Sequence, residues 1–275
     1  SKNFKDFLPT PTSRNFFLTP VIPTELAQII ENRKYTHPTD ESGISNMLLK
    51  KIAIQIAIPL SIIINASFLY GKFPTKWKDI KIIPLFKRKG DPLAMNNYRP
   101  IAIINIFAKI IEIVMQEKLV RYLESFNAFH EMQFGYRKKK SIHDAIILNL
   151  NMIAESINAG NYHLNIFLDA KKAFDSVDRN ILLYKLENNG IRGTTLNWFK
   201  SYLSGRSQKV VIGNTTSNKV SVSDHGVLQG SALSAALFIL FMSDFLTLMN
   251  GKAIGYADDI LLSTSASNKF NLQET

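Results

Sequence analysis

The spacing of hydrophobic residues along the chain predicts several amphipathic helices. Apolar positions recur at intervals of three and four over residues 106–126, with lysine and glutamate on the opposite face. A serine followed three residues later by an aspartate, Ser141 and Asp144, is the pattern of a capping box. Further helices, each ending near a glycine, are expected over residues 141–159, 177–189, 195–203 and 231–249.

Shorter apolar runs bounded by turn residues predict strands. They cover residues 77–84, residues 162–170, a hairpin over residues 208–224, and two strands within residues 252–265. The run at 162–170 is almost wholly apolar, which is typical of a strand in the centre of a sheet. The two strands of the last pair meet at a bend that holds Asp258 and Asp259.

Residues 52–70 form 19 consecutive positions without a charge, flanked by lysines. This length is sufficient to cross a bilayer. The stretch also contains Pro59 and several polar side chains, which suit a kinked helix buried in protein equally well. The stretch at 231–249 carries Asp244, which argues against a membrane span. We expect no membrane partner.

Composition and charge narrow the class of protein. The 275 residues carry a formal net charge of +11, which favours a polyanionic partner, usually nucleic acid or an anionic surface. Cysteine is absent, so disulfides and thiolate zinc sites are excluded. The first residues lack the apolar segment of a secretory signal, so a nuclear or cytoplasmic location is expected rather than secretion.

Acidic residues at the ends of predicted strands indicate a site that binds metal ions. Asp258 and Asp259 stand between apolar segments, where an uncompensated pair of carboxylates is costly unless a cation neutralises it. Asp169 ends the strand at 162–170, and Asp175 follows it by six residues. Hard oxygen ligands at one sheet edge suit magnesium, and two such ions can stabilise the attacking and leaving oxygens of a phosphoryl displacement.

Five segments, in this order along the chain, resemble motifs of the reverse transcriptases. They read "NYRPIAIINIFAKIIE", "MQFGYRKKKSIHDA", "FLDAKKAFDSVD", "GVLQGSALSAALFILFMSDF" and "GYADDILL". The first two are similar to fingers motifs of the non-LTR retrotransposon branch, with its jockey- and LINE-like elements. The last three are similar to the family's catalytic motifs. The resemblance covers roughly residues 77–263 and implies RNA-directed DNA synthesis from dNTPs on an RNA template with a DNA or RNA primer.

The resemblance also implies roles for particular residues. Asp169, Asp258 and Asp259 would hold two Mg²⁺ ions, with Mn²⁺ as a possible substitute, and the carbonyl of Ala170 would join them. Phe174 matches the family's steric gate against a 2′-hydroxyl. The remaining implied contacts are to nucleotide, from Gln229, Gly230, Arg99 and Lys109, and to the template backbone, from Arg137, Lys138, Lys139 and Lys140.

The fold implied is α+β, with the fingers and palm of a right-handed polymerase and an antiparallel palm sheet backed by helices. We expect an N-terminal extension over residues 1–76, fingers over 77–160 and palm over 161–275. The family's next palm motif, its primer grip and its thumb would lie beyond Thr275. We therefore expect the thumb to be missing from this chain.

Two departures from the family pattern leave a second function open. Leu228 and Ala235 stand where the family usually has proline, and a lost proline frees backbone entropy. These departures favour a decayed or domesticated remnant that binds RNA without polymerising, whereas the intact aspartates oppose it. A splicing factor similar to the group II intron maturases is a further alternative, although "NYRPIA" and "FGYR" fit non-LTR elements better.

Overall fold

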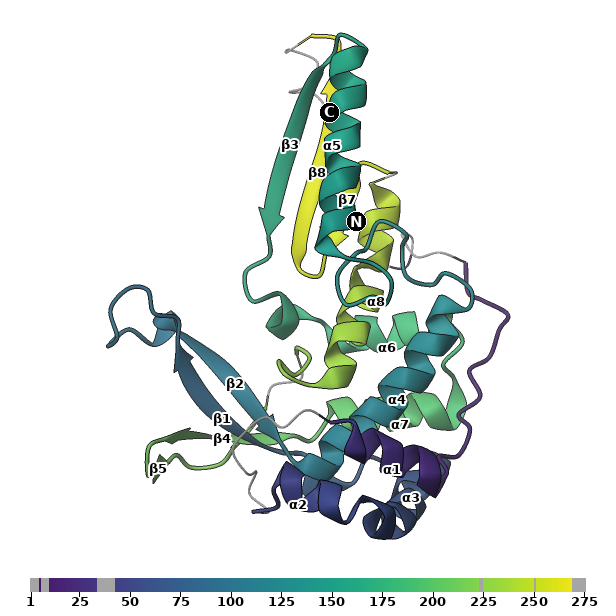
Figure 1. The fold of residues 1–275 in the computed structure, drawn as a ribbon, viewed down its shortest axis with the longest axis vertical. Coiled ribbons are helices and arrows are strands. Elements are labelled where there is room, and N and C mark those ends of the chain that lie inside the picture. Colours follow the sequence, from purple (N-terminus) through teal and green to yellow (C-terminus); the bar gives the residue numbers. More distant parts are fainter. Residues whose placement is uncertain (1–4, 6–9, 34–42, 223–224, 250, 269–275) are drawn as a thin grey trace.

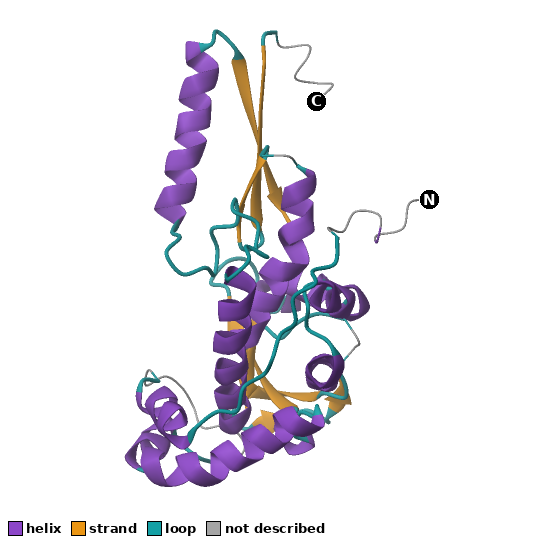
Figure 2. Ribbon diagram, turned by 90° about the vertical axis from the view of Figure 1, so that its right-hand side faces the viewer, coloured by secondary structure: helices purple, strands orange, loops and turns teal. Residues whose placement is uncertain are grey.

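The structure is a computed structural model that describes residue 5 and residues 10–33, 43–222, 225–249 and 251–268. Parts of the expected N-terminal extension, and residues 269–275 of the expected palm, lie outside the described residues. Helices and strands both contribute extensively (Figures 1 and 2), so the predicted α+β class is confirmed. The fingers, palm and extension limits remain predictions.

The helices lie close to the positions that the hydrophobic spacing predicted. The capping box is present, because Ser141 accepts from the Asp144 amide while the Asp144 carboxylate accepts from the Ser141 amide. Asn105 caps the helix that begins at Ile106, because its side-chain oxygen accepts from the amides of Phe107 and Ala108. The helices are α1 Pro23–Glu31, α2 Asn46–Lys51, α3 Ala53–Tyr70, α4 Ile106–Glu124, α5 Ile142–Asn158, α6 Arg179–Asn188, α7 Gly193–Leu203 and α8 Ala232–Leu248.

The larger sheet joins strands that lie far apart in sequence. β1 (Asp79–Phe86) pairs antiparallel with β2 (Tyr98–Ile104) and parallel with β4 (Ser207–Ile212). The short strands β5 (Thr215–Thr216) and β6 (Val220–Ser221) both pair with β4. The expected hairpin is therefore present. The sequence did not predict that β4 would lie beside β1, across the expected boundary between fingers and palm.

The smaller sheet is antiparallel and has the order β3–β8–β7. It consists of β3 (Tyr162–Asp169), β7 (Ala253–Tyr256) and the central strand β8 (Asp259–Ala266). α5 lies along one face of this sheet (Figure 2). Ala145 and Leu148 of α5 cluster there with Ile254 and Leu261 of the sheet and with Phe134 of the preceding loop. The end of α8 packs on the other face, where Leu246 meets Ala253 and Ile260.

The predicted central position of the strand at 162–170 was wrong. β3 lies at the edge of the sheet within the described residues, and its Phe167 side chain is 77% exposed. The apolar residues of a strand indicate that both of its faces pack against other parts of the protein. They do not indicate which strands lie beside it, because that depends on residues far away in the sequence. The described residues cover the faces of β3 only in part.

The main core surrounds a group of stacked aromatic side chains. The Trp198 ring on α7 lies parallel to the Tyr202 ring at 5.5 Å between centroids and meets Phe73 edge-on at 5.6 Å. The Trp198 indole N–H donates to the Ser67 hydroxyl of α3 at 2.9 Å, so its polar atom is satisfied although the side chain is fully buried. This group ties α3 to α7.

α3 has the length and composition of a membrane-spanning helix. In the structure it packs against α1 and α7 and contributes Ile64 and Leu60 to the core. Its other face exposes Ile54 and Ile62. Pro59 lies inside the helix.

One carboxylate is wholly buried between three helices. Glu112 of α4 is 0% exposed, and its Oε1 accepts from the Tyr202 hydroxyl at 2.9 Å. The same hydroxyl lies 2.9 Å from the Ser231 hydroxyl, which accepts from the amide of Leu233 at the start of α8. Burial raises the pKa of Glu112 above its ordinary range, although Arg206 and other neighbours oppose the rise. Glu112 therefore links α4 and α7 to the first turn of α8.

Glu112→Gln should weaken the dependence of stability on pH. A carboxyl whose pKa is raised by folding contributes stability that is present below its unfolded pKa of about 4.3 and is lost as pH rises through the folded value. We therefore expect the urea midpoint of the wild-type chain to fall from pH 5 to pH 8 by more than that of the variant. Equal slopes for the two proteins would show that Glu112 does not titrate with folding.

Candidate active site at the end of the small sheet

Strand register brings the predicted acidic residues to one end of the small sheet. Asp169, the last residue of β3, lies directly opposite Asp259, the first residue of β8. Asp259 also pairs with Tyr256 of β7, so Ala257 and Asp258 form the two-residue turn of the β7–β8 hairpin. Residues opposite one another in a ladder point to the same face. Asp169 and Asp259 therefore share a face, with Asp258 beside them in the turn.

The side chains of these aspartates are accessible but are not assembled around a common point. Asp169 and Asp259 are exposed and Asp258 is half-buried. Throughout the described part of the chain, no three metal-ligating side chains lie close enough to hold one ion together. The donor types fit a hard divalent cation such as Mg²⁺. The backbone thus places the carboxylates at one edge, and their side chains would still have to turn inward.

The turn that holds Asp258 has an unusual backbone. Ala257 has φ +59°, a left-handed conformation that glycine adopts far more readily than alanine. A loop that precedes α5 supports it. The side-chain oxygen of Gln133 accepts from the Ala257 amide at 3.0 Å and from the Gly135 amide at 2.9 Å. Sequence reasoning treated this segment only as part of a fingers motif, although a glutamine and a glycine within "MQFGY" were a usable signal.

Phe174 lies close to this end of the sheet. It stacks on Phe238 of α8 at 4.5 Å between ring centroids and meets the edge of Tyr136 at 6.3 Å. Burial raises the pKa of the Tyr136 hydroxyl, and the negative charge of Asp258 adds to the rise. Phe174 as a whole residue is half-buried. Tyr136 therefore connects Phe174 to the aspartate turn.

The segment before α8 contacts both Phe174 and the larger sheet. The Val227 amide donates to the Phe174 carbonyl at 2.8 Å. Gln229 and Gly230 form the turn that follows, and Gly230 has φ +99°. A Cβ at Gly230 would lie 3.4 Å from the carbonyl oxygen of Ala102 on β2. This segment thus bridges the candidate site and the larger sheet.

The predicted basic contacts divide into exposed and engaged side chains. Arg99 on β2, Lys138 and Lys139 are exposed. The Arg137 guanidinium makes a two-pronged ion pair with Glu124, at 2.9 and 2.6 Å, and also donates to the His130 carbonyl at 2.8 Å. The guanidinium of Arg137 is therefore already engaged by the protein.

Two predicted lysines are partly withdrawn from solvent. Burial lowers the pKa of Lys109, which faces the Glu112 cluster rather than the aspartate end. The Lys140 ammonium donates to the Glu131 carbonyl and lies 4.5 Å from the centre of the Phe134 ring. The structure therefore does not bring Lys109 to the aspartates, and Lys140 is half-buried against the loop that precedes α5.

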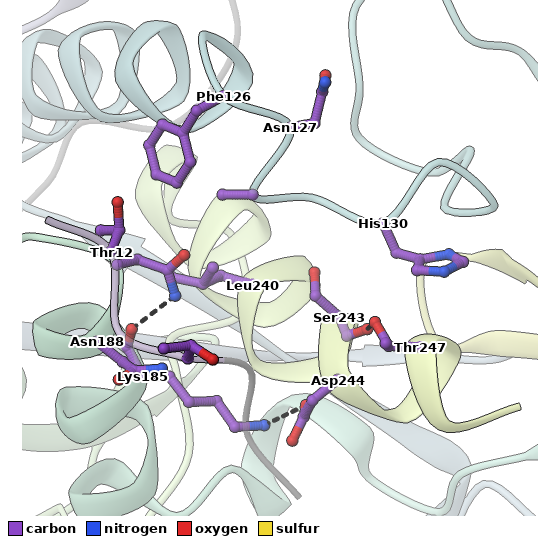
Figure 3. A pocket seen from close by; sticks show the side chains of 13 residues that line it. Thr12, Phe126, Asn127, His130, Lys185, Asn188, Leu240, Ser243, Asp244 and Thr247 are labelled. Carbon is purple, nitrogen blue, oxygen red and sulfur yellow. Dashed lines mark hydrogen bonds and ion pairs between the residues drawn. The ribbon is translucent and has the colours of Figure 1, made fainter. Parts of the chain in front are cut away.

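A pocket of about 290 Å³ lies away from these residues, between α6, α8 and the N-terminal segment (Figure 3). The Lys185 ammonium pairs there with the Asp244 carboxylate at 2.5 Å. None of the candidate site residues lines it. The pocket therefore does not extend the aspartate site.

Three features indicate a nucleic-acid polymerase. They are the order of the motifs, the acidic end of the antiparallel sheet and the helix that follows the Gln229–Gly230 turn. A family model described as reverse transcriptase (RNA-dependent DNA polymerase) matches residues 87–274. The chain therefore belongs to the reverse transcriptase family, as the motifs indicated.

Similar proteins of known name indicate the branch of the reverse transcriptase family to which the chain is related. The chain is 26% identical over 268 residues to the RNA-directed DNA polymerase from mobile element jockey of Drosophila funebris, which covers 94% of this chain and 29% of that protein. It is 28% identical over 228 residues to a probable RNA-directed DNA polymerase from transposon X-element of Drosophila melanogaster, covering 82% and 25%. The predicted resemblance to non-LTR retrotransposon proteins is thus confirmed. The chain spans under a third of the length of these relatives.

Proposed function

We propose that this chain is part of an RNA-directed DNA polymerase of a non-LTR retrotransposon. The reaction joins a primer 3′-hydroxyl to the α-phosphate of a dNTP, with release of pyrophosphate. The observation that carries the proposal is the register pair of Asp169 and Asp259, with Asp258 in the adjoining turn. The family match over residues 87–274 includes all three.

In this proposal the three carboxylates and the Ala170 carbonyl hold two Mg²⁺ ions, which Mn²⁺ can replace. When bound, such ions supply charge stabilisation for the attacking and leaving oxygens. The exposed positions of Asp169 and Asp259 leave room for phosphate oxygens beside them. Asp258 lies in the turn and not in a strand, so the alternation of side chains in the sheet does not set the direction of its side chain.

Around the carboxylates, other residues orient the nucleotide and template. Phe174 excludes a ribose 2′-hydroxyl. Gln229 and Gly230 pack against the incoming nucleotide. Arg99 is exposed for contact with the triphosphate. Lys138 and Lys139 attract the template backbone. Arg137 and Lys140 hold the loop that carries Lys138 and Lys139, through the ion pair with Glu124 and the hydrogen bond to the Glu131 carbonyl. Lys109 lies near Glu112, away from this surface.

The two departures from the family pattern fit their surroundings. Ala235 lies inside the first turns of α8, where alanine favours the helix. Leu228 packs against the main core. Both positions are therefore accommodated, which weakens the argument for a remnant that binds RNA without polymerising.

Single-nucleotide addition tests the proposal most directly. A labelled oligo(dT) primer on poly(rA) should gain one ddTMP when the chain is supplied with the chain terminator ddTTP and Mg²⁺, and EDTA should abolish the product. Adding one nucleotide requires only the active site, whereas long extension also requires a grip on the duplex. Tight binding of the primer-template without any addition in Mg²⁺ or Mn²⁺ would contradict the proposal and favour the RNA-binding remnant.

Phe174→Ala should relax the choice between deoxy- and ribonucleotides. Removing the ring opens space beside the ribose, so we expect the dTTP/UTP ratio of addition rates to fall about tenfold or more. Phe174→Tyr, which keeps the ring, is the matched control and should retain the wild-type ratio. An unchanged ratio in the alanine variant would leave Phe174 as a packing partner of Phe238 alone.

Charge reversal at Lys138 and Lys139 should weaken RNA binding. Each lost phosphate contact reduces the number of counterions released, so both affinity and its salt dependence should fall. We expect the slope of log affinity against log salt to become shallower by about 1 to 2 for the double glutamate variant. Reversal of Lys50 and Lys51 on α2 changes the net charge equally and serves as the control. Equal losses in both variants would show that only net charge matters.

A further inference from the structure

The loop that precedes α5 lies directly against the β7–β8 hairpin (Figure 1). The Phe134 amide donates to the Gly255 carbonyl at 2.7 Å, and the Gly255 amide donates to the Met132 carbonyl at 2.9 Å. Gln133 therefore pairs with Gly255 as a short extra strand would. The acidic turn is held from outside its own sheet, by a segment more than 120 residues earlier in the chain.

Within this contact the Gln133 side chain is placed with little freedom. It is 1% exposed, and its one carbonyl oxygen accepts from two amides, those of Gly135 and Ala257. A carbonyl oxygen has two acceptor lone pairs, so both are used. A buried amide N–H left without a partner is costly, which makes this acceptor important to the Ala257 position.

The turn needs such support because of its conformation. Ala257 is the first central residue of the two-residue turn, and its φ of +59° is disfavoured for a residue with a Cβ. Strained backbone of this kind persists where its surroundings over-determine it. The approach is so close that a Cβ on Gly135 would lie 2.2 Å from the Ala257 nitrogen.

The chemistry of the side chain also suits the place. An amide oxygen accepts hydrogen bonds without adding a negative charge beside two aspartates. An apolar side chain would leave the Ala257 amide unsatisfied.

We propose that Gln133 is a positioning residue that holds the Ala257–Asp258 turn and thereby sets where the Asp258 carboxylate stands for metal binding. This inference rests on the proposed function for the role of Asp258, and on the Gln133 contacts alone for the hold on the turn. Gln133 touches neither nucleotide nor metal in this scheme. It acts through the backbone of Ala257.

Hydrogen exchange of single amides, followed by NMR, tests the hold on the turn. In Gln133→Met, which keeps length but removes the acceptor, the Ala257 amide should exchange about tenfold faster or more. Amides in the middle of the β3–β8 ladder should remain within about twofold of wild type, since their partners are untouched. Gln133→Glu restores acceptor oxygens and should return the Ala257 rate towards wild type. Gln28→Met on α1 controls for the substitution itself.

An unchanged exchange rate of the Ala257 amide in Gln133→Met would show that Gln133 does not hold the turn. If that variant loosens the whole sheet, Gln133→Asn decides, because it keeps a polar amide but falls short of Ala257. Selective acceleration at Ala257 in the asparagine variant supports the inference, and equal acceleration of turn and ladder amides contradicts it.

A metal titration then tests the consequence for Asp258. Tb³⁺ luminescence, sensitised by nearby Tyr256 and competed with Mg²⁺, should report an affinity that Asp258→Asn abolishes. Gln133→Met should weaken that affinity several-fold, while Gln28→Met should keep it. Affinity that depends on Asp258 but not on Gln133 would overturn the positioning role and leave the proposed function standing. If the wild-type chain binds no Tb³⁺ through Asp258, the proposed two-metal function fails, and Gln133 cannot position Asp258 for metal.

Discussion

Asp258→Asn should reduce single-nucleotide addition by at least about a hundredfold, the scale on which removing one preorganised electrostatic group acts. The substitution removes one negative charge from the carboxylates proposed to hold Mg²⁺. It leaves the turn intact, because asparagine tolerates turn positions as readily as aspartate. The loss should therefore appear in the rate of addition while the fold and primer-template binding persist.

The comparison requires a variant with the same chemical change elsewhere. Glu155→Gln alters an exposed residue on α5 outside the candidate site and should keep wild-type addition. RNA binding by Asp258→Asn should be unchanged or slightly tighter, since a negative charge near the polyanion is gone. Addition by Asp258→Asn at the wild-type rate would remove the central claim of the proposed mechanism.

Trp198→Ala should lower the free energy of unfolding by about 3–5 kcal/mol, the range found when a large buried aromatic side chain is deleted. The ring is fully buried and stacked on Tyr202, and its N–H donates to Ser67 of α3. The deletion leaves a cavity and removes the N–H that donates to the buried Ser67 hydroxyl, which keeps its own hydrogen bond to the Lys72 carbonyl. A loss of this size is a large share of the stability of an ordinary domain.

Urea denaturation followed by circular dichroism measures this loss. Trp198→Phe separates packing from hydrogen bonding, because it keeps most of the apolar area and loses the N–H. We expect it to cost about 1–2 kcal/mol, closer to the cost of the hydrogen bond with some loss of packing. An alanine variant as stable as wild type would mean that the α3–α7 contact is not part of the cooperative core.

Local structure was the part of this fold that the sequence predicted well. Helix limits, the Ser141–Asp144 capping box and the Asp258 bend follow from interactions between residues close in the chain, which periodicity and turn chemistry report. The convergence of Asp169 with Asp259 was predicted only through the family's motif order. Strand ends by themselves do not reveal which strands are neighbours.

Long-range contacts were the part that it could not predict. The run "RKKK" does not reveal which of its cations are engaged by the protein, yet Arg137 pairs with Glu124, thirteen residues away, while Lys138 and Lys139 stay exposed. The edge position of β3 and the hold of Gln133 on Ala257 are of the same kind. Each depends on a partner that becomes a neighbour only after folding.

The parallel pairing of β1 with β4 has a mechanical consequence. Four consecutive residues of β1, from Asp79 to Ile82, pair with β4, and β4 in turn carries β5 and β6. A rigid-body swing of the β1–β2 hairpin must therefore drag the β4–β6 segment with it. Such a swing would bend the backbone where this sheet joins its neighbouring helices, between β2 and α4 and between α7 and β4.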